Sequence, residues 1–220
     1  MSCLAAAATI MFLFWTITHI ARRMTGKRRE ELSTREAVTV FGAGLVGALA
    51  YTFTDTFWFS AVEAEVYALS SLFTAVVFWA ILKWEDVADR EGNERWLILI
   101  AYLMGLSIGV HILNLLTIPA LVFVYYFRKT PKITSWGVIK ATLLSGVLIL
   151  IVNKLIIPYT TSIGAWVDRV FNSMGMPVNR GIILYVVLLF AALGTAVWYT
   201  QKRGKKLANL ILTCFTVILI

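Results

Sequence analysis

The stretch WLILIAYLMGLSIGVHILNLLTIPALVFVYYF, residues 96–127, decides the fold of this protein. Its 32 residues include no Asp, Glu, Lys or Arg. As one α-helix it would be about 48 Å long, whereas the hydrocarbon core of a bilayer is about 30 Å thick. The stretch is therefore either one strongly tilted helix or a hairpin of two short helices, and the tip of such a hairpin would fall near Gly109-Val110-His111.

The rest of the chain has the same apolar character. Hydrophobic residues make up 60% of the 220 residues and charged residues only 15%, whereas soluble domains average about 45–50% and about 25%. Lipid must cover the excess apolar surface, so we expect an all-α, polytopic transmembrane bundle that forms a single transmembrane domain over 1–220. The further apolar runs lie at roughly 3–21, 37–54, 60–82, 137–157, 181–200 and 207–220.

The basic residues favour the hairpin. Cytoplasmic loops of membrane proteins collect Lys and Arg, and the hairpin places 17 of the 20 basic residues on one side. A single tilted pass would divide them almost evenly. We therefore predict about eight passes with the N-terminus outside, and a hairpin tip below the outer membrane surface, where protein or a cavity must shield its backbone. The net charge of +8 is then a topology signal, and we expect no nucleic-acid partner.

Other features narrow the function. The sequence Gly42-Ala-Gly44-Leu-Val-Gly47 matches the G-x-G-x-x-G pattern, but it lies inside an apolar run with no preceding strand, so close helix packing explains it better than dinucleotide binding. Cys3 and Cys214 lie in apolar runs, and we expect no metal site and no cofactor. Because the first run begins at Met1 and the last ends at Ile220 after about 14 residues, too few for an ordinary span of about 20, we expect a fragment of a longer membrane protein.

Three carboxylates lie close together on the predicted outer side, at Asp55, Glu63 and Glu65. Carboxylates at membrane depth are costly, and they usually face a cavity or a partner. At helical spacing, Glu63 belongs to a polar stripe, whereas Glu65 continues into apolar positions, so we favour Glu63 as the inward-facing group. The stripe is either a site for a polar substrate or a polar seam between helices. Its members are Thr56, Ser60, Glu63, Tyr67, Ser70 and Thr74.

Other polar residues are weaker candidates. His111, with Asn114 three residues on, could bind a phosphate, donate to a sugar hydroxyl or shuttle protons; the simpler interpretation is that it caps the broken helix. Arg180 could meet a phosphate. Residues 159–176, which include Asp168 of the outer acidic set, repeat apolar positions at helical spacing and predict an amphipathic helix in the outer interface.

Three stretches carry a family resemblance: Phe12–His19 (FLFWTITH), Asp55–Tyr67 (DTFWFSAVEAEVY) and Gly105–Asn114 (GLSIGVHILN). They resemble a bacterial family of multi-pass membrane proteins of unknown function, the DUF twenty-seven twenty-three family. That family is similar to protein O-mannosyltransferases of the GT-C glycosyltransferase superfamily.

The resemblance implies an enzyme of the bacterial inner membrane that uses a polyprenyl-phosphate-linked sugar donor at the outer, periplasmic face. A hydroxyl of a protein or glycan acceptor would attack the anomeric carbon. In such enzymes the catalytic carboxylate usually follows the first transmembrane helix. The chain resembles the family from a later helix onward, so the catalytic residue is unknown. The substrate-cavity candidates are Asp55, Glu63, Glu65, Tyr67, His111, Asn114 and Arg180.

Two alternatives stay open from the sequence. A carboxylate near a broken helix also occurs in transporters and flippases, although these often carry inverted repeats with paired broken helices, and only one broken run stands out here. A non-catalytic membrane subunit is the other alternative.

Overall fold

The computed structural model describes residues 1–63 and 66–219. All regular elements of these residues are helices, which confirms the predicted all-α class. The helices form two compact units, Met1–Pro131 and Lys132–Ile220, which are described one by one.

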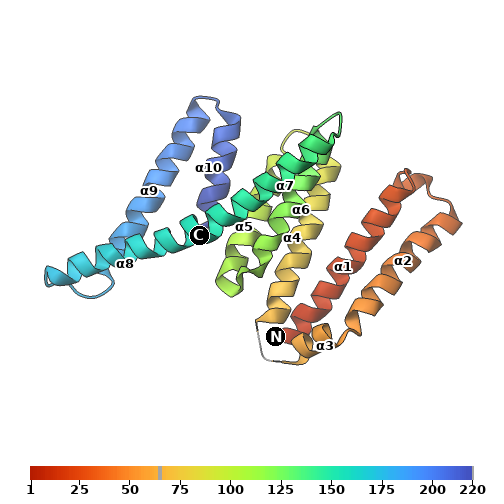
Figure 1. Ribbon diagram of the computed structural model, residues 1–220, viewed down its shortest axis with the longest axis horizontal. Coiled ribbons are helices and arrows are strands. Elements are labelled where there is room, and N and C mark those ends of the chain that lie inside the picture. Colours follow the sequence, from red (N-terminus) through yellow and green to blue (C-terminus); the bar gives the residue numbers. More distant parts are fainter. Residues whose placement is uncertain (64–65, 220) are drawn as a thin grey trace. The chain divides into compact units, whose positions relative to one another are not determined.

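The first unit is a bundle in which α1 packs against both α2 and α4, and α4 also packs against α5 and α6 (Figure 1). Its core includes Val77, Ile81, Trp84 and Ile100, which are almost completely buried. The elements of this unit are α1 (Ser2–Met24), η1 (Arg29–Glu31), α2 (Thr34–Thr52), α3 (Asp55–Val62), α4 (Tyr67–Val87), α5 (Glu94–Val110), η2 (Ile112–Leu116) and α6 (Thr117–Lys129).

The stretch 96–127 forms the predicted hairpin. Helix α5 ends at Val110, His111 has an extended backbone, and the short 3-10 helix η2 leads into α6. The far end of α6 returns to the connection between α4 and α5, because Lys129 Nζ donates at 2.7 Å to the carbonyl of Ala88, the residue after α4. The break at His111 therefore lies at the tip, as expected.

The small residues of α2 allow close packing against α1. A Cβ atom added at Gly44 would collide with the Thr18 side chain and lie 3.0 Å from the Phe14 ring, and one added at Gly47 would lie 2.6 Å from Ile17 Cδ1. Since the match to G-x-G-x-x-G lies within this helix, the structure agrees with the packing interpretation and with the rejection of dinucleotide binding.

The polar stripe does not lie on one helix, and this corrects the sequence-based expectation. Helix α3 ends at Val62 and α4 begins only at Tyr67, and α2 and α3 meet at a bend of 69°. Glu63 has an extended backbone (φ −76°, ψ 146°) directly after α3. Local contacts hold α3 in place: Cys3 Sγ donates to the carbonyl of Ala61 at 3.3 Å, and Phe57 is buried.

The second unit contains a long helix and a helical hairpin. The predicted pass 137–157 and the predicted amphipathic helix join into one helix of 39 residues. It consists of α7 (Ser135–Leu150), a π-helical segment η3 (Ile151–Ile156) and α8 (Ile157–Ser173). Pro158, which has no N–H to donate, lies two residues after the last residue of the π-helical segment. Helix α8 packs against α9 (Arg180–Lys202), and α9 packs against α10 (Lys206–Ile218).

Five helical segments of the described residues are long and apolar enough to cross a membrane, or six if the bent pair α2–α3 is one span. Each of the seven predicted apolar runs contains a helix among the described residues, but α5 has 17 residues and α10 has 13. Such helices are about 25 and about 20 Å long, shorter than the hydrocarbon core. The chain is thus a polytopic helical membrane protein in which the hairpin arm α5 and the last helix are short, as the sequence predicts.

Candidate functional site

The first unit contains a cavity of about 720 Å³ between the middle of α1, the end of α2, α3, α4 and η2. Its apolar walls come from Leu13, Phe57, Ala75, Phe78 and Leu113. The rest of its lining is almost entirely hydroxyl-bearing. These side chains are Thr9, Thr16, Tyr51, Thr54, Thr56, Ser60, Tyr67, Ser70, Ser71 and Thr74.

Five of the six residues of the predicted polar stripe line this cavity. Thr56 and Ser60 reach it from α3, and Tyr67, Ser70 and Thr74 reach it from α4. Glu63, the sixth member, is exposed and is absent from the lining. The stripe thus converges through the packing of two helices rather than along one. An assembly of hydroxyl groups with apolar walls suits a polar ligand with many hydrogen-bonding groups.

Tyr67 and His111, two of the predicted site residues, lie next to each other. Their ring centroids are 5.6 Å apart. His111 Nδ1 accepts a hydrogen bond from the backbone N–H of Leu113 at 3.2 Å, so the ring caps η2, in agreement with the simpler interpretation from sequence. In a neutral His111 the hydrogen is then on Nε2, because Nδ1 acts as the acceptor.

Asn114 lies in the same turn and is almost completely buried. Its backbone carbonyl accepts from Thr117 Oγ1 at 2.7 Å, whereas its side-chain amide has no hydrogen-bond partner among the described residues. Ser107 Oγ is also buried and also has no hydrogen-bond partner among the described residues. Unsatisfied buried polar groups cost free energy unless water or a ligand pairs with them. The hairpin tip is therefore a polar spot inside the bundle.

Asp55 and Glu63 do not line the cavity. Asp55 is the first residue of α3 and is exposed, between the lining residues Thr54 and Thr56. Its position in the first turn is favourable because a helix N-terminus attracts negative charge. Glu63 follows the other end of α3. Glu65 lies outside the described residues.

Arg180 and Asp168 belong to the second unit. Asp168 is buried and accepts from the backbone N–H of Gly181 at 3.1 Å and from Asn172 Nδ2 at 3.2 Å. The Asp168 carboxylate therefore accepts a backbone N–H of the first turn of α9 and has a structural role. Arg180, the first residue of α9, is exposed.

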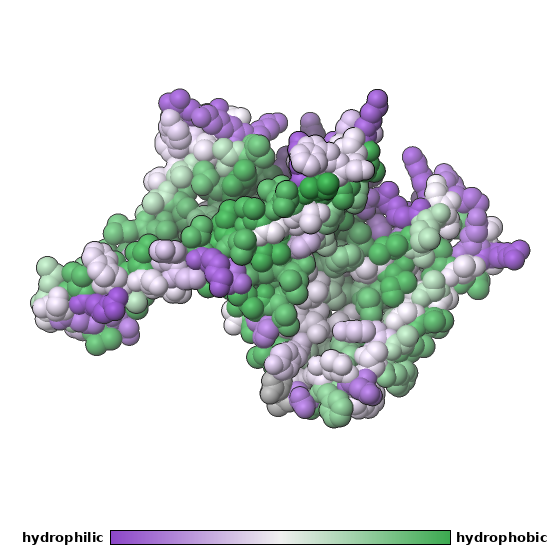
Figure 2. Space-filling view, viewed as in Figure 1, coloured by the Kyte–Doolittle hydropathy of each residue, from purple (hydrophilic) through white to green (hydrophobic). Residues whose placement is uncertain are grey.

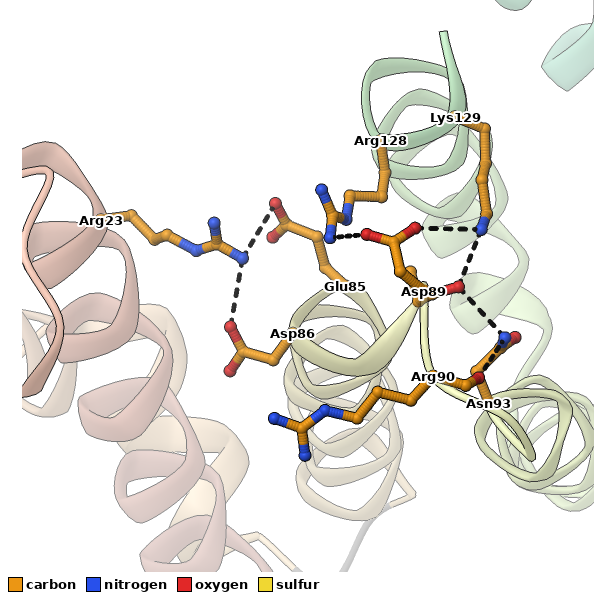
Figure 3. A network of polar contacts seen from close by, with 9 residues as sticks. Arg23, Glu85, Asp86, Asp89, Arg90, Asn93, Arg128 and Lys129 are labelled. Atoms are coloured by element: carbon orange, nitrogen blue, oxygen red, sulfur yellow. Dashed lines mark hydrogen bonds and ion pairs between the residues drawn. The ribbon is translucent and has the colours of Figure 1, made fainter. Parts of the chain in front are cut away.

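The opposite end of the first unit carries a network of ion pairs (Figure 3). From α1, Arg23 reaches Glu85 at 3.3 Å and Asp86 at 3.1 Å. From α6, Arg128 and Lys129 reach Asp89. The end of α4 and the turn after it are therefore tied by ion pairs to α1 and to α6. We name this end the basic end, and the end with Asp55 and Glu63 the acidic end.

Sequence reasoning missed the cavity residues that come from other helices. Thr9 and Thr16 of α1 are buried, with 4% and 7% exposure, and Tyr51 comes from α2. The sequence does indicate that Thr9 and Thr16 share one face of an apolar helix, because they are seven residues apart. Nothing in the sequence of α1 indicates which helix that face meets.

The comparison with protein families gives a match over the first unit. The model of the TMEM260 N-terminal domain of protein O-mannosyl-transferase covers residues 1–134, which is more than half of the chain and includes the whole first unit. No curated protein and no solved structure matches the chain.

Proposed function

Because the chain belongs to the protein O-mannosyl-transferase family of the TMEM260 N-terminal domain, we propose that it takes part in transferring a sugar from a polyprenyl-phosphate-linked donor to a hydroxyl group of a protein acceptor. The reaction takes place at the outer face of the membrane, and the hydroxyl-lined cavity holds the sugar. The family match supports the reaction class, and we place the reaction in the bacterial inner membrane.

The observation that carries the proposal is the lining of the cavity. A mannosyl group carries several hydroxyls that donate and accept hydrogen bonds, and its ring carbons have apolar faces. The cavity has ten hydroxyl-bearing side chains beside Phe57 and Phe78. Four of these hydroxyls donate to a nearby backbone carbonyl and can still accept a hydrogen bond from a sugar; they belong to Thr9, Thr54, Ser60 and Thr74. Its position among the long apolar helices α1 and α4 also suits a donor with a lipid tail.

The glycosyl transfer consists of three bond changes. The acceptor oxygen forms a bond to the anomeric carbon, the bond from that carbon to the donor phosphate oxygen breaks, and the acceptor proton passes to a base. We propose that Asp55 and Glu63 orient the acceptor at the acidic end and that His111 Nε2, beside Tyr67, donates to the leaving phosphate. The principal base is not assigned to a residue of this chain. A site with little water favours transfer over hydrolysis.

The first test is sugar transfer in membranes that contain the protein, with polyprenyl-phosphate mannose as donor and a Ser/Thr peptide as acceptor. Glu63→Gln and Thr56→Val should each lower kcat/KM about tenfold or more, because Thr56 lines the cavity and Glu63 is the carboxylate proposed to orient the acceptor. The matched controls are Glu94→Gln in the first turn of α5 and Thr39→Val in α2, two positions outside the cavity lining.

The controls should keep the activity of the unchanged protein. Undiminished transfer in Glu63→Gln would remove Glu63 from the mechanism, and undiminished transfer in Thr56→Val would remove its hydroxyl from sugar binding. Substrate uptake into proteoliposomes without any transfer would contradict the proposed function and favour a transporter.

A further inference from the structure

The first unit has a second cavity, of about 560 Å³, toward its basic end. It lies between α1, η1, α2 and α4, and it shares no lining residue with the hydroxyl-lined cavity. Neither the family nor the proposed reaction gives it a role. We call it the basic aromatic cavity, after the basic and aromatic residues described below.

One part of this cavity is apolar and aromatic. The rings of Trp15 and Trp79 have centroids 5.9 Å apart, and those of Phe14 and Phe41 stack with centroids 6.2 Å apart. Val40, with 7% exposure, adds a buried aliphatic wall. Tryptophan gathers where membrane proteins meet the headgroup region of the bilayer. This part therefore suits an aliphatic chain rather than a soluble ion.

The other part is cationic. Arg22, Arg29 and Lys83 line it. Arg22 lies 3.8 Å from Asp86 and is partly compensated. Lys83 Nζ lies 5.6 Å from the centroid of the Trp79 ring, and neither Lys83 nor Arg29 forms an ion pair with a carboxylate of the described residues. Two cations without a counter-ion thus line one cavity.

His19 provides a further, independent observation. It lines the same cavity and is 9% exposed, and its Nε2 has no hydrogen-bond partner within the described part of the chain. Its Nδ1 lies 3.7 Å from Asp86. A buried imidazole nitrogen without a partner usually indicates a water or a ligand that the protein itself does not supply.

The hydropathy of the surface agrees with a membrane-boundary position. Hydrophilic side chains gather over the loop between α1 and α2, and apolar side chains cover the flanks of the helices below that loop (Figure 2). The cavity joins these two zones, because its cations come from the loop and the helix ends and its rings come from within α1, α2 and α4.

We propose that the basic aromatic cavity binds an anionic phospholipid, with its phosphate at Arg29, Lys83 and Arg22 and one acyl chain along Phe14, Phe41 and Val40. A zwitterionic lipid carries a choline that the same cations repel, so the site selects net negative charge. The site holds a structural or regulatory lipid at the basic end, apart from the sugar cavity.

The test is native mass spectrometry of the full chain released from detergent, titrated with phosphatidylglycerol and separately with phosphatidylcholine. We expect phosphatidylglycerol to bind more tightly. Each of Arg29→Gln and Lys83→Gln should weaken it about fivefold, and the double variant about 25-fold, as expected for removing cations near an anionic headgroup. Lys83→Arg should restore the binding.

Arg35→Gln is the matched control, because Arg35 is exposed, lies close to the same loop and does not line the cavity. It should leave lipid binding unchanged. Equal binding of the two lipids, or equal loss in Arg35→Gln and in the cavity variants, would overturn the proposal. A further arm adds inorganic phosphate at millimolar concentration: displacement of the lipid by phosphate alone would show a site for soluble phosphate and would also overturn it.

We expect Arg29→Gln to weaken lipid binding without unfolding the protein. Arg29 is exposed in the short helix η1, outside the candidate spans, so Arg29→Gln should keep the helical circular dichroism of the unchanged protein. An unaltered affinity for phosphatidylglycerol in a folded Arg29→Gln protein contradicts the proposed position of the phosphate.

Discussion

At the residue scale, His111 shows how one side chain can serve local structure and border a site. Its Nδ1 satisfies the N–H of Leu113 at the start of η2, and its ring lies beside Tyr67, which lines the hydroxyl-lined cavity. Leu113 itself lines the cavity as well. The cap therefore fixes the backbone of a cavity wall.

The cap can be tested by His111→Ala and His111→Asn. His111→Ala leaves the N–H of Leu113 without its acceptor and should lower the free energy of unfolding by about 1 kcal/mol, the usual cost of losing a side-chain cap. His111→Asn keeps a short side-chain acceptor and should lose less. Thermal unfolding of the purified protein in detergent measures both. Equal destabilisation by the two variants would show that the cap contributes nothing.

At the element scale, the contact between α1 and α2 depends on glycine. The Thr18 side chain and the Phe14 ring occupy the space that a Cβ at Gly44 would need, whereas a Cβ at Gly42 would meet nothing within 4 Å. Both glycines belong to the same G-x-G-x-x-G match. Gly44 is therefore required for helix packing, whereas Gly42 of the same helix has room for a larger side chain.

Gly44→Ala should therefore lower the free energy of unfolding by about 1–3 kcal/mol, the usual cost of overpacking, because Thr18 is β-branched and adapts poorly. Gly42→Ala is the matched control and should stabilise the protein by up to about 1 kcal/mol, since alanine favours the helix more than glycine. Thermal unfolding in detergent measures the difference. A Gly44→Ala protein as stable as Gly42→Ala would contradict the close approach of α1 and α2.

At the scale of the whole molecule, charge is sorted along the first unit. The ion pairs of Arg23, Arg128 and Lys129 lie at the basic end, together with the ends of α1, α4 and α6. Asp55 and Glu63 mark the acidic end, where Cys3 near the start of α1 meets Ala61 of α3. The hairpin makes this sorting possible, because it returns α6 to the basic end.

Sidedness follows from the same arrangement and can be tested by cysteine labelling. In a protein with Cys3 and Cys214 replaced by Ser, Phe53→Cys after α2 should react with a membrane-impermeant maleimide from outside. Thr130→Cys at the end of α6 should react only after permeabilisation, because basic loops stay inside. These positions flank the acidic and basic ends. Labelling of both from the same side would contradict the predicted topology.

The sequence by itself determined the helical membrane class, the hairpin with its tip at His111 and the packing role of the small residues in α2. These features follow from composition, helix length and residue size, which act locally along the chain. The residues Thr56, Ser60, Tyr67, Ser70 and Thr74 were also recognised as one polar group.

Only the tertiary structure decided how that group is assembled. Helix α3 ends at Val62, although the stretch VEAEVY, 62–67, contains no Gly or Pro that would indicate a helix end. The sequence is therefore read as one continuous helix, whose periodicity predicts that Glu63 faces inward. Helix α3 is held by tertiary contacts that a hydropathy pattern cannot predict. Phe57 is buried, and Cys3 contacts Ala61. The threonines of α1 complete the cavity for the same reason: a helical pattern reveals which residues share a face, and only packing reveals what that face meets.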